Sequence, residues 1–183
     1  EEHPCQAMAD LLTVLEQRGT LRGVRLAFVG DGFNVAQSLA EAAALTGVHF
    51  AMASPEGYEL PSGIVQMIAE LARANGGSFE QHESAADAVR NADVVYTDVW
   101  ASMGQEDTYA QRKEAFAGYS ITAELMSLAK PDAIFMHDLP AHRGEEVAED
   151  VIEGAQSVVF DQAENRLHAQ KAILALVASE HAL

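Results

Sequence analysis

Short apolar runs alternate with amphipathic segments along almost the whole chain, and this alternation most constrains its fold. The runs at 24–29, 48–53, 94–97 and 133–136 are nearly continuous in apolar residues, which is typical of strands buried on both faces of a sheet. A more polar run at 78–82 and an apolar run at 157–160 extend the set. The pattern predicts an α/β fold: a Rossmann-like, doubly wound parallel sheet of five to six strands with helices on both faces.

The segments between the predicted strands have apolar residues at helical spacing and end at residues that stop helices. The segment 5–17 is followed by Gly19, and the segment 34–46 is followed by Gly47. Glycine is the usual residue just past a helix C-terminus. Further helices are expected at 61–74, 85–91, 109–117, 122–128 and about 164–181.

Right-handed crossovers restrict the sheet to few topologies, and we expect the strand order 3-2-1-4-5 with a sixth strand beside the fifth. Polar motifs follow the first, fourth, fifth and sixth predicted strands, at 30–34, 97–106, 136–146 and 161–166. Because parallel strands end at one edge of the sheet, these motifs should meet there. A ligand crevice is expected where the strand order reverses, between strands one and four.

Composition excludes several classes of function. The 183 residues form one domain, 1–183, and carry 11 basic and 28 acidic residues, for a net charge of −17. Such a surface repels nucleic acids and anionic membranes. No apolar run reaches the length of a membrane span, and no signal-peptide pattern is present. The single cysteine, Cys5, argues against a disulfide or a cysteine-based zinc site and fits a cytoplasmic protein.

The motifs at the predicted sheet edge resemble those of the ornithine carbamoyltransferase family in identity, order and spacing. The likeness spans nearly the whole chain but covers only the second, ornithine-binding domain of that enzyme. The family's first domain holds phosphate with a Ser-Thr-Arg-Thr-Arg motif, which this sequence lacks. Since the chain also starts without Met and close to a motif, it suits an excised or processed fragment. The motifs are His-Pro-Cys-Gln at 3–6, Gly-Asp-Gly-Phe-Asn at 30–34, Thr-Asp-Val-Trp and Ser-Met-Gly within 97–104, His-Asp-Leu-Pro at 137–140, and Glu-Asn-Arg at 164–166.

The resemblance implies transfer of a carbamoyl group from carbamoyl phosphate to the side-chain amine of ornithine, with no metal and no organic cofactor. It implies catalytic roles for Asp98, Asp138 and Arg166. It implies that ornithine contacts Asn34, Asp98, Ser102 and Met103, and that carbamoyl phosphate contacts His3, Gln6, Asp138, Leu139 and Arg166.

Two pocket positions depart from the family pattern. Asp138 stands where the family has Cys, and Phe33 stands where it has Asn. Asp138 puts a second carboxylate near Asp98, so one pKa should rise or a cation should lie between the two groups. The bulky ring of Phe33 should reduce the volume of the pocket and exclude water from it. With both pocket positions altered, we expect ornithine binding to be weak or lost. Because the phosphate-binding motif is also absent, we expect the isolated domain to be inactive, since substrate orientation can lower the barrier by ~7–11 kcal/mol.

A remodelled scaffold is the main alternative: a designed hydrolase, binder or assembly that uses the altered pocket. His142 with Asp138 would make an acid–base pair, and Asp98, Asp138 and His142 together have the chemistry of a metal site. His137 is not expected to pair with Asp138, because neighbours on a strand point to opposite faces.

The fold alone also suggests a nicotinamide-dependent oxidoreductase. The Gly-Asp-Gly at 30–32 starts like a dinucleotide fingerprint, but Val35 stands where the third glycine belongs. A tight turn with Asp31 or Gly32 near a helix N-cap is therefore the favoured interpretation of this motif.

The first and the last predicted helices, at 5–17 and about 164–181, each carry a wide apolar stripe. In the terminal helix the stripe includes Leu167, Ile173, Leu174 and Val177. The stripe either folds back on the sheet or associates with another copy of the chain. The histidines at 49, 82, 168 and 181 are interpreted as surface residues.

Overall fold

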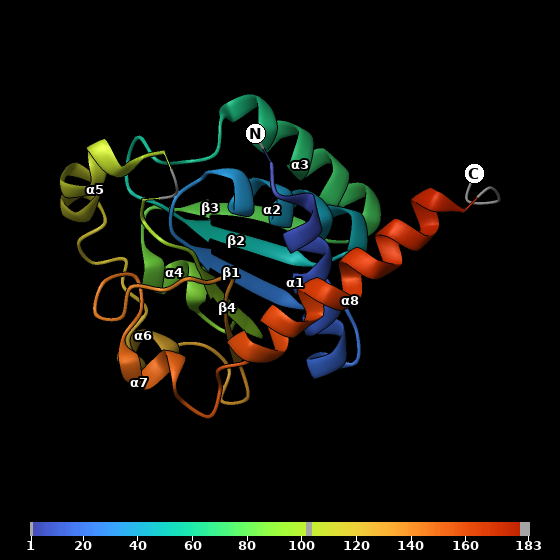
Figure 1. The fold of residues 1–183 in the computed structure, drawn as a ribbon. Coiled ribbons are helices and arrows are strands. Elements are labelled where there is room, and N and C mark those ends of the chain that lie inside the picture. The colour runs from blue at the N-terminus through green and yellow to red at the C-terminus, as the bar shows by residue number, and fades with distance from the viewer. Residues whose placement is uncertain (1, 102–103, 180–183) are drawn as a thin grey trace.

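A computed structural model describes residues 2–101 and 104–179. Its centre is a five-stranded parallel sheet with the order β3-β2-β1-β4-β5, shown in Figure 1. In the register of this sheet, Leu26 of β1 lies between Phe50 of β2 and Val94 of β4. The predicted α/β class and the order of the first five strands are confirmed. The strands are β1 Arg25–Val29, β2 His49–Ala53, β3 Ser78–His82, β4 Val94–Thr97 and β5 Ile134–His137.

Helices cover both faces of the sheet because successive strand residues point to opposite sides. Phe28 and Tyr96 point to the face under α1, α2 and α3, where their rings stack with centroids 5.5 Å apart. Val95 and Phe135 point to the face under α4, α6 and α7. The helices are α1 Pro4–Arg18, α2 Asn34–Thr46, α3 Ser62–Asn75, α4 Ala85–Val89, α5 Tyr109–Ala115, α6 Ala123–Met126, α7 Glu149–Ile152 and α8 Val159–Ala178, with a 3-10 turn at Glu106–Thr108.

The prediction of a sixth strand at 157–160 is wrong. Ser157 makes only an isolated bridge with Phe135, and α8 begins at Val159 instead of near residue 164. The side chain of Gln162 replaces the missing strand in part, because its Oε1 accepts the His137 backbone N–H at 2.9 Å. A side chain of α8 therefore accepts the hydrogen bond of the His137 N–H at the edge of β5, where a sixth strand would otherwise accept it.

Other helix boundaries differ by a few residues. The helix expected at 122–128 is the single turn α6, which the Thr122 hydroxyl caps by accepting the Leu125 N–H. The short helix α7 has no counterpart among the predictions. None of the helices within 2–101 and 104–179 combines the length and the apolar character needed to cross a bilayer.

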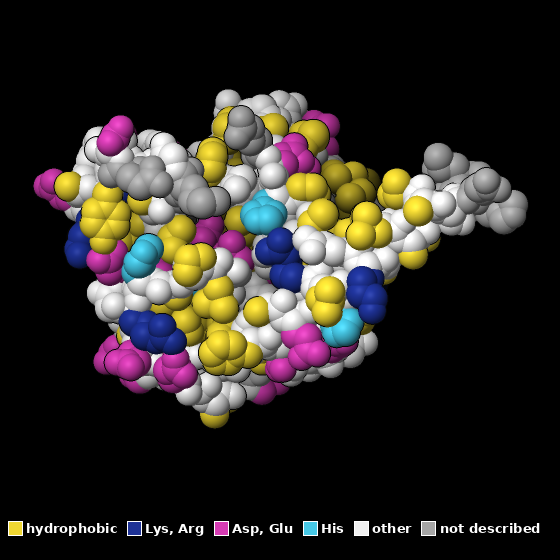
Figure 2. All heavy atoms as spheres, in the orientation of Figure 1, with side chains coloured by type: hydrophobic (Ala, Val, Ile, Leu, Met, Phe, Trp, Pro, Cys, Tyr) yellow, Lys and Arg dark blue, Asp and Glu magenta, His cyan; other side chains and the backbone are white. Residues whose placement is uncertain are grey.

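The C-terminal half of α8 extends beyond the body of the domain, as Figure 1 shows. The N-terminal half packs through Val159 and Ala169, whereas Leu174 and Val177 are 67% and 79% exposed. Hydrophobic side chains are visible along this projecting part in Figure 2. This end of the stripe therefore does not fold back on the sheet.

Candidate functional site

A cavity of about 320 Å³ lies where β1, β4 and β5 end, at the reversal of strand order where a crevice was expected. Four sequence motifs that lie far apart along the chain contribute to it. A hollow of about 420 Å³ beside α6 and α7 is larger, but none of the sequence motifs contributes to its lining. Its charged lining residues are Lys130 and Asp150. The smaller cavity is lined by Glu2, His3, Phe33, Asn34, Val35, Asp98, Val99, Asp138, Leu139 and Pro140.

The turn after β1 brings Phe33 and Asn34 to this cavity. Gly32 N–H donates to the Tyr58 carbonyl at 2.7 Å, and a Cβ on Gly32 would lie 2.4 Å from backbone atoms of the facing loop. Glycine is therefore required for this close approach. The N-cap of α2 is Phe33, with no side-chain cap. Asn34 Oδ1 accepts the Val35 N–H at 2.9 Å, a contact that does not use the amide NH₂ group.

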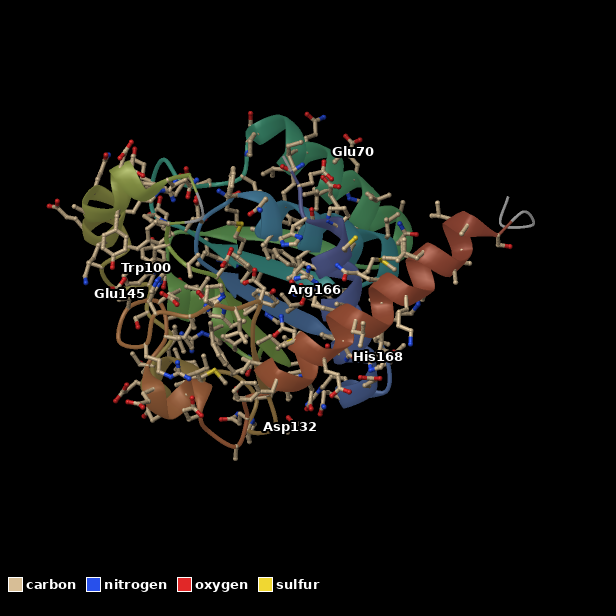
Figure 3. The ribbon with its side chains drawn as sticks, in the orientation of Figure 1. Glu70, Trp100, Asp132, Glu145, Arg166 and His168 are labelled. Carbon is tan, nitrogen blue, oxygen red and sulfur yellow. The ribbon has the colours of Figure 1, made fainter. Side chains whose placement is uncertain are left out.

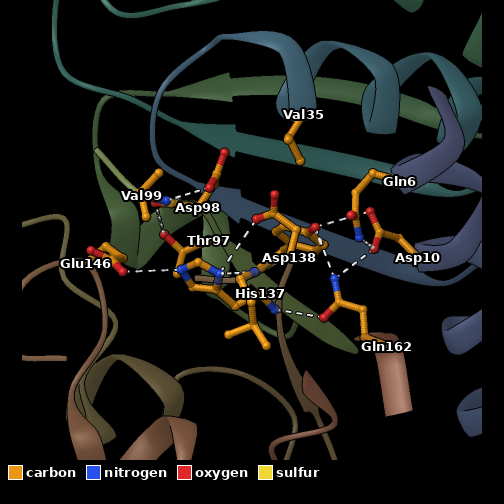
Figure 4. Close-up of polar contacts among 12 residues, drawn as sticks. Gln6, Asp10, Val35, Thr97, Asp98, Val99, His137, Asp138, Glu146 and Gln162 are labelled. Carbon is orange, nitrogen blue, oxygen red and sulfur yellow. Dashed lines mark hydrogen bonds and ion pairs between the residues drawn. The ribbon is translucent and has the colours of Figure 1, made fainter. Parts of the chain in front are cut away.

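Asp98 and Asp138 meet at the ends of β4 and β5. One carboxylate oxygen of each and a ring nitrogen of His137 all lie within 4.8 Å of one another, as the close-up in Figure 4 shows. Asp98 Oδ1 accepts the Val99 N–H at 2.6 Å. Asp138 is 10% exposed, and its Oδ1 has no hydrogen-bond partner among the described residues.

Burial raises the pKa of both carboxyl groups. Desolvation is the largest cause for each, and the nearby charge of Asp98 raises the pKa of Asp138 further. Hydrogen bonds with Asp138 and with the Val99 N–H oppose the rise for Asp98. Two like charges this close disfavour joint ionisation, so protonation is favoured at one member of the pair, at Asp138 rather than at Asp98. A cationic group entering the cavity would replace that proton.

The side chains of His137 and Asp138 approach one another although the two are chain neighbours, but Asp138 Oδ1 makes no hydrogen bond with the ring. The strand ends at His137, and the chain turns through Leu139, whose φ is 58°. His137 Nδ1 accepts the Leu139 N–H at 2.9 Å and lies 3.6 Å from Asp138 Oδ1. Nε2 faces Glu146 Oε1 at 3.3 Å. This arrangement assigns the ring proton to Nε2, which makes His137 a fixed support for the turn.

A buried polar cluster that the motifs did not reveal lies beneath this site. Asp10 Oδ1 accepts hydrogen bonds from the amides of Gln6 at 2.8 Å and Gln162 at 2.7 Å, and Oδ2 accepts one from the Tyr96 hydroxyl at 3.1 Å. Burial raises the pKa of Asp10 to about 7, against the opposing effect of these bonds. The only advance signal was a carboxylate one turn after Gln6, on the inner face of the first helix.

Arg166 lies beside the cavity and is not among its lining residues. Its guanidinium on α8 donates to Gln6 Oε1 of α1, and Figure 3 shows it between these helices. The pKa of His3 is lowered by burial and then by the charge of Arg166, so the two groups face one another. His3, Gln6 and Arg166 therefore form one rim, next to Asp138. Ser102 and Met103 lie outside the described residues.

The segment after β4 is anchored by Arg112 and an aromatic cluster. The guanidinium Nη1 of Arg112 donates to Asp31 Oδ2 at 2.5 Å and to the Trp100 carbonyl at 2.8 Å, and the group lies 5.0 Å from the Tyr58 ring centroid. Trp100 stacks on Phe116 with centroids 5.8 Å apart. Asp31 thus has a structural partner, which supports interpreting the Gly-Asp-Gly motif as a turn.

Comparison with known proteins places this site in a family. The sequence profile described as "Aspartate/ornithine carbamoyltransferase, Asp/Orn binding domain" matches residues 22–177. The chain belongs to the aspartate/ornithine carbamoyltransferase family. The predicted relationship to the ornithine carbamoyltransferases is therefore confirmed.

Curated and solved relatives agree with this assignment. An ornithine carbamoyltransferase of Symbiobacterium thermophilum is 60% identical over 177 residues, which are 97% of this chain and 57% of that protein. The structure of the Pyrococcus furiosus ornithine carbamoyltransferase matches with a TM-score of 0.91 and 52% identity, covering 95% of this chain and 56% of that one. The anabolic enzyme of Campylobacter jejuni matches with a TM-score of 0.91 at 35% identity, covering 97% and 59%. The chain thus spans little more than half the length of these relatives.

Proposed function

We propose that these 183 residues form the ornithine-binding half of an ornithine carbamoyltransferase. The observation that carries the proposal is the convergence of Asn34, Asp98 and Asp138 on one cavity at the switch point of the sheet. A side-chain amide and a carboxylate suit the head group of an α-amino acid. We further propose a role in arginine biosynthesis and a cytoplasmic location for this protein.

The chemistry follows from the groups around the cavity. The side-chain amine of ornithine attacks the carbonyl carbon of carbamoyl phosphate, a new C–N bond forms, and the C–O bond to phosphate breaks. Donors of His3 and Arg166 stabilise the negative charge that develops on the carbonyl oxygen, and Gln6, whose amide bonds to Asp10 and Arg166, positions the guanidinium. The proton that the amine loses goes to a neighbouring carboxylate, for which the Asp98 and Asp138 pair is the nearest candidate.

Catalysis requires more than these residues supply. The sequence has no Ser-Thr-Arg-Thr-Arg motif and 11 basic residues in total, so the second substrate has no cradle for its phosphate. We therefore propose that the 183 residues alone bind amino-acid ligands weakly and form no citrulline.

Calorimetric titration with ornithine and norvaline tests the assignment. Norvaline lacks the reacting amine, so the pair separates head-group recognition from side-chain recognition. We expect ornithine to bind and the Asn34→Ala and Asp98→Asn variants to lose this binding, with Glu164→Gln on the exposed face of α8 as control. Binding of neither ligand, or citrulline formation by the 183 residues with carbamoyl phosphate, would contradict the proposal.

The two unusual pocket residues are tested in the same assay. Phe33 is 36% exposed and lines the cavity together with Asp138, whose carboxyl pKa is raised by burial. We expect Phe33→Asn and Asp138→Cys, separately and together, to raise the affinity for ornithine. Equal affinity in all variants would mean that neither residue has altered the pocket.

A further inference from the structure

A second group of titratable side chains lies on the turn that follows the pocket motif. Ligand-type atoms of His142, Glu145 and Glu146 all lie within 4.8 Å of one another. The Glu145 N–H donates to the His142 carbonyl at 3.0 Å, and Gly144 in this turn has a left-handed φ of 85°. The tight turn brings an imidazole and two carboxylates to one point, which we call the 142–146 cluster.

Glu146 is the buried member of the cluster, and half of its carboxylate is unsatisfied. Its side chain is 0% exposed. Oε1 accepts the His142 backbone N–H at 2.5 Å and faces His137 Nε2 at 3.3 Å. Oε2 has no hydrogen-bond partner among the described residues, and the His142 ring nitrogen Nδ1 stands 3.8 Å away. An unpaired buried carboxylate oxygen is destabilising, and a bound cation would remove that penalty.

The other two members open the cluster to solvent. The His142 side chain is 52% exposed, and the Glu145 side chain is 18% exposed. Figure 3 shows Glu145 at the edge of the molecule near α5. Its carboxylate is held in place by the Tyr109 hydroxyl and by Lys113 Nζ at 2.9 Å. Lys113 is itself 55% exposed, so it has room to move aside for another cation.

We propose that His142, Glu145 and Glu146 form a binding site for a divalent transition-metal ion such as Zn²⁺. Imidazole and carboxylate are suitable ligands for such ions. Three protein ligands leave a fourth position for water, and metal–ligand distances of about 2.0–2.2 Å place ligand atoms roughly 3.4 Å apart. The 3.8 Å between His142 Nδ1 and Glu146 Oε2 is close to that separation. The acidic net charge of −17 also favours a cation.

The neighbouring group of Asp98, His137 and Asp138 is less suited to a metal ion. His137 Nδ1 already accepts the Leu139 N–H at 2.9 Å, and Nε2 faces Glu146. Neither ring nitrogen is available, so that group offers only two carboxylates. The proposed metal site therefore uses none of the residues that line the ornithine cavity, and it stands independently of the proposed function. It departs from the absence of a metal that the family resemblance implied.

Titration calorimetry with Zn²⁺ tests the site on the full 183-residue chain carrying Cys5→Ser, which removes the thiol. We expect one bound ion, and we expect His142→Ala and Glu145→Gln each to weaken binding by about tenfold or more, at least the effect of losing an outer-shell partner. His168→Ala is the matched control, because His168 is 50% exposed and lies 3.5 Å from Glu164 on α8. That variant should bind Zn²⁺ as tightly as the parent.

Two further measurements separate ligation from general charge effects. Lys113→Ala should tighten Zn²⁺ binding, because it removes the cation that competes for Glu145. Co²⁺ should give a visible absorption spectrum that His142→Ala abolishes, while circular dichroism shows that the variant is folded. Absence of binding, equal binding by His142→Ala, or binding lost in Asp138→Asn and kept in His142→Ala would overturn the proposal.

Discussion

Asp10 shows how a single buried carboxylate can organise side chains from three elements. It accepts hydrogen bonds from Gln6 of its own helix, from Tyr96 of β4 and from Gln162 of α8. Gln6 in turn accepts from Arg166, and Gln162 accepts from the end of β5. The cluster therefore connects the rim of the candidate site to the core, and its protonation state matters for stability.

We predict that Asp10 makes stability fall as pH rises. Burial raises its folded-state pKa from 3.8 to about 7, so the folded state binds the proton more tightly than the unfolded state. The resulting stabilisation is complete below pH 4 and is lost as pH passes through 7, a change on the order of 4 kcal/mol. Urea unfolding between pH 4 and 8 should show a smaller decline for Asp10→Asn than for the parent. Asp161→Asn, on the exposed part of α8, should keep the parental decline; equal slopes in all three proteins would contradict the assignment.

At this scale the sequence predicts some contacts and hides others. Asn34, Asp98 and Asp138 follow strand ends, so the parallel topology alone predicts that they lie near one another. Asp10 lies inside a helix, and nothing local distinguishes it from a solvated acid. The approach of the His137 ring to Asp138 depends on the left-handed turn at Leu139. Strand periodicity does not predict such a turn.

Among the elements, α8 is the one whose role was least evident from its sequence. Its first residues read as a strand, because Val158, Val159 and Phe160 are apolar and β-favouring. The structure places Ser157 in a single bridge and starts the helix directly after it. Tertiary contacts decide this outcome, since Gln162 satisfies the His137 N–H at the β5 edge and anchors the helix on the buried cluster.

We predict that Gln162→Ala destabilises the domain by about 1–3 kcal/mol, because it leaves the buried His137 N–H and part of the Asp10 cluster unpaired. Gln17→Ala is the matched control, since Gln17 makes only an exposed contact of 3.5 Å with Asp161. The free energy of unfolding from urea titration is the measurement. A loss no larger than that of the control would show that the helix start does not depend on this side chain.

For the whole molecule, the main unpaired feature is the apolar end of α8. Leu174, Leu176 and Val177 are 64% to 79% exposed, and Met8 on α1 is 51% exposed. Water contact with such a stripe is unfavourable, so the 183 residues should associate through it. The relatives are longer than this chain, and their additional residues offer another way to cover the stripe.

Sedimentation velocity measures this association directly. We expect the weight-average sedimentation coefficient to rise with protein concentration, and we expect the double variant Leu174→Lys, Val177→Lys to remain monomeric. Glu70→Lys, at an exposed position on α3, adds the same two units of positive charge and is the control. A parent chain that stays monomeric at every concentration would contradict the prediction.

The position of Arg112 has a consequence for the segments that follow β1 and β4. One guanidinium, in a side chain that is 12% exposed, bonds to Asp31 after the first strand and to Trp100 after the fourth, and lies over the ring of Tyr58. If any of these turns loosened alone, a charge would be stranded away from water. The segments that follow β1 and β4 are therefore tied to one another through a single side chain, so neither can shift without the other losing its anchor.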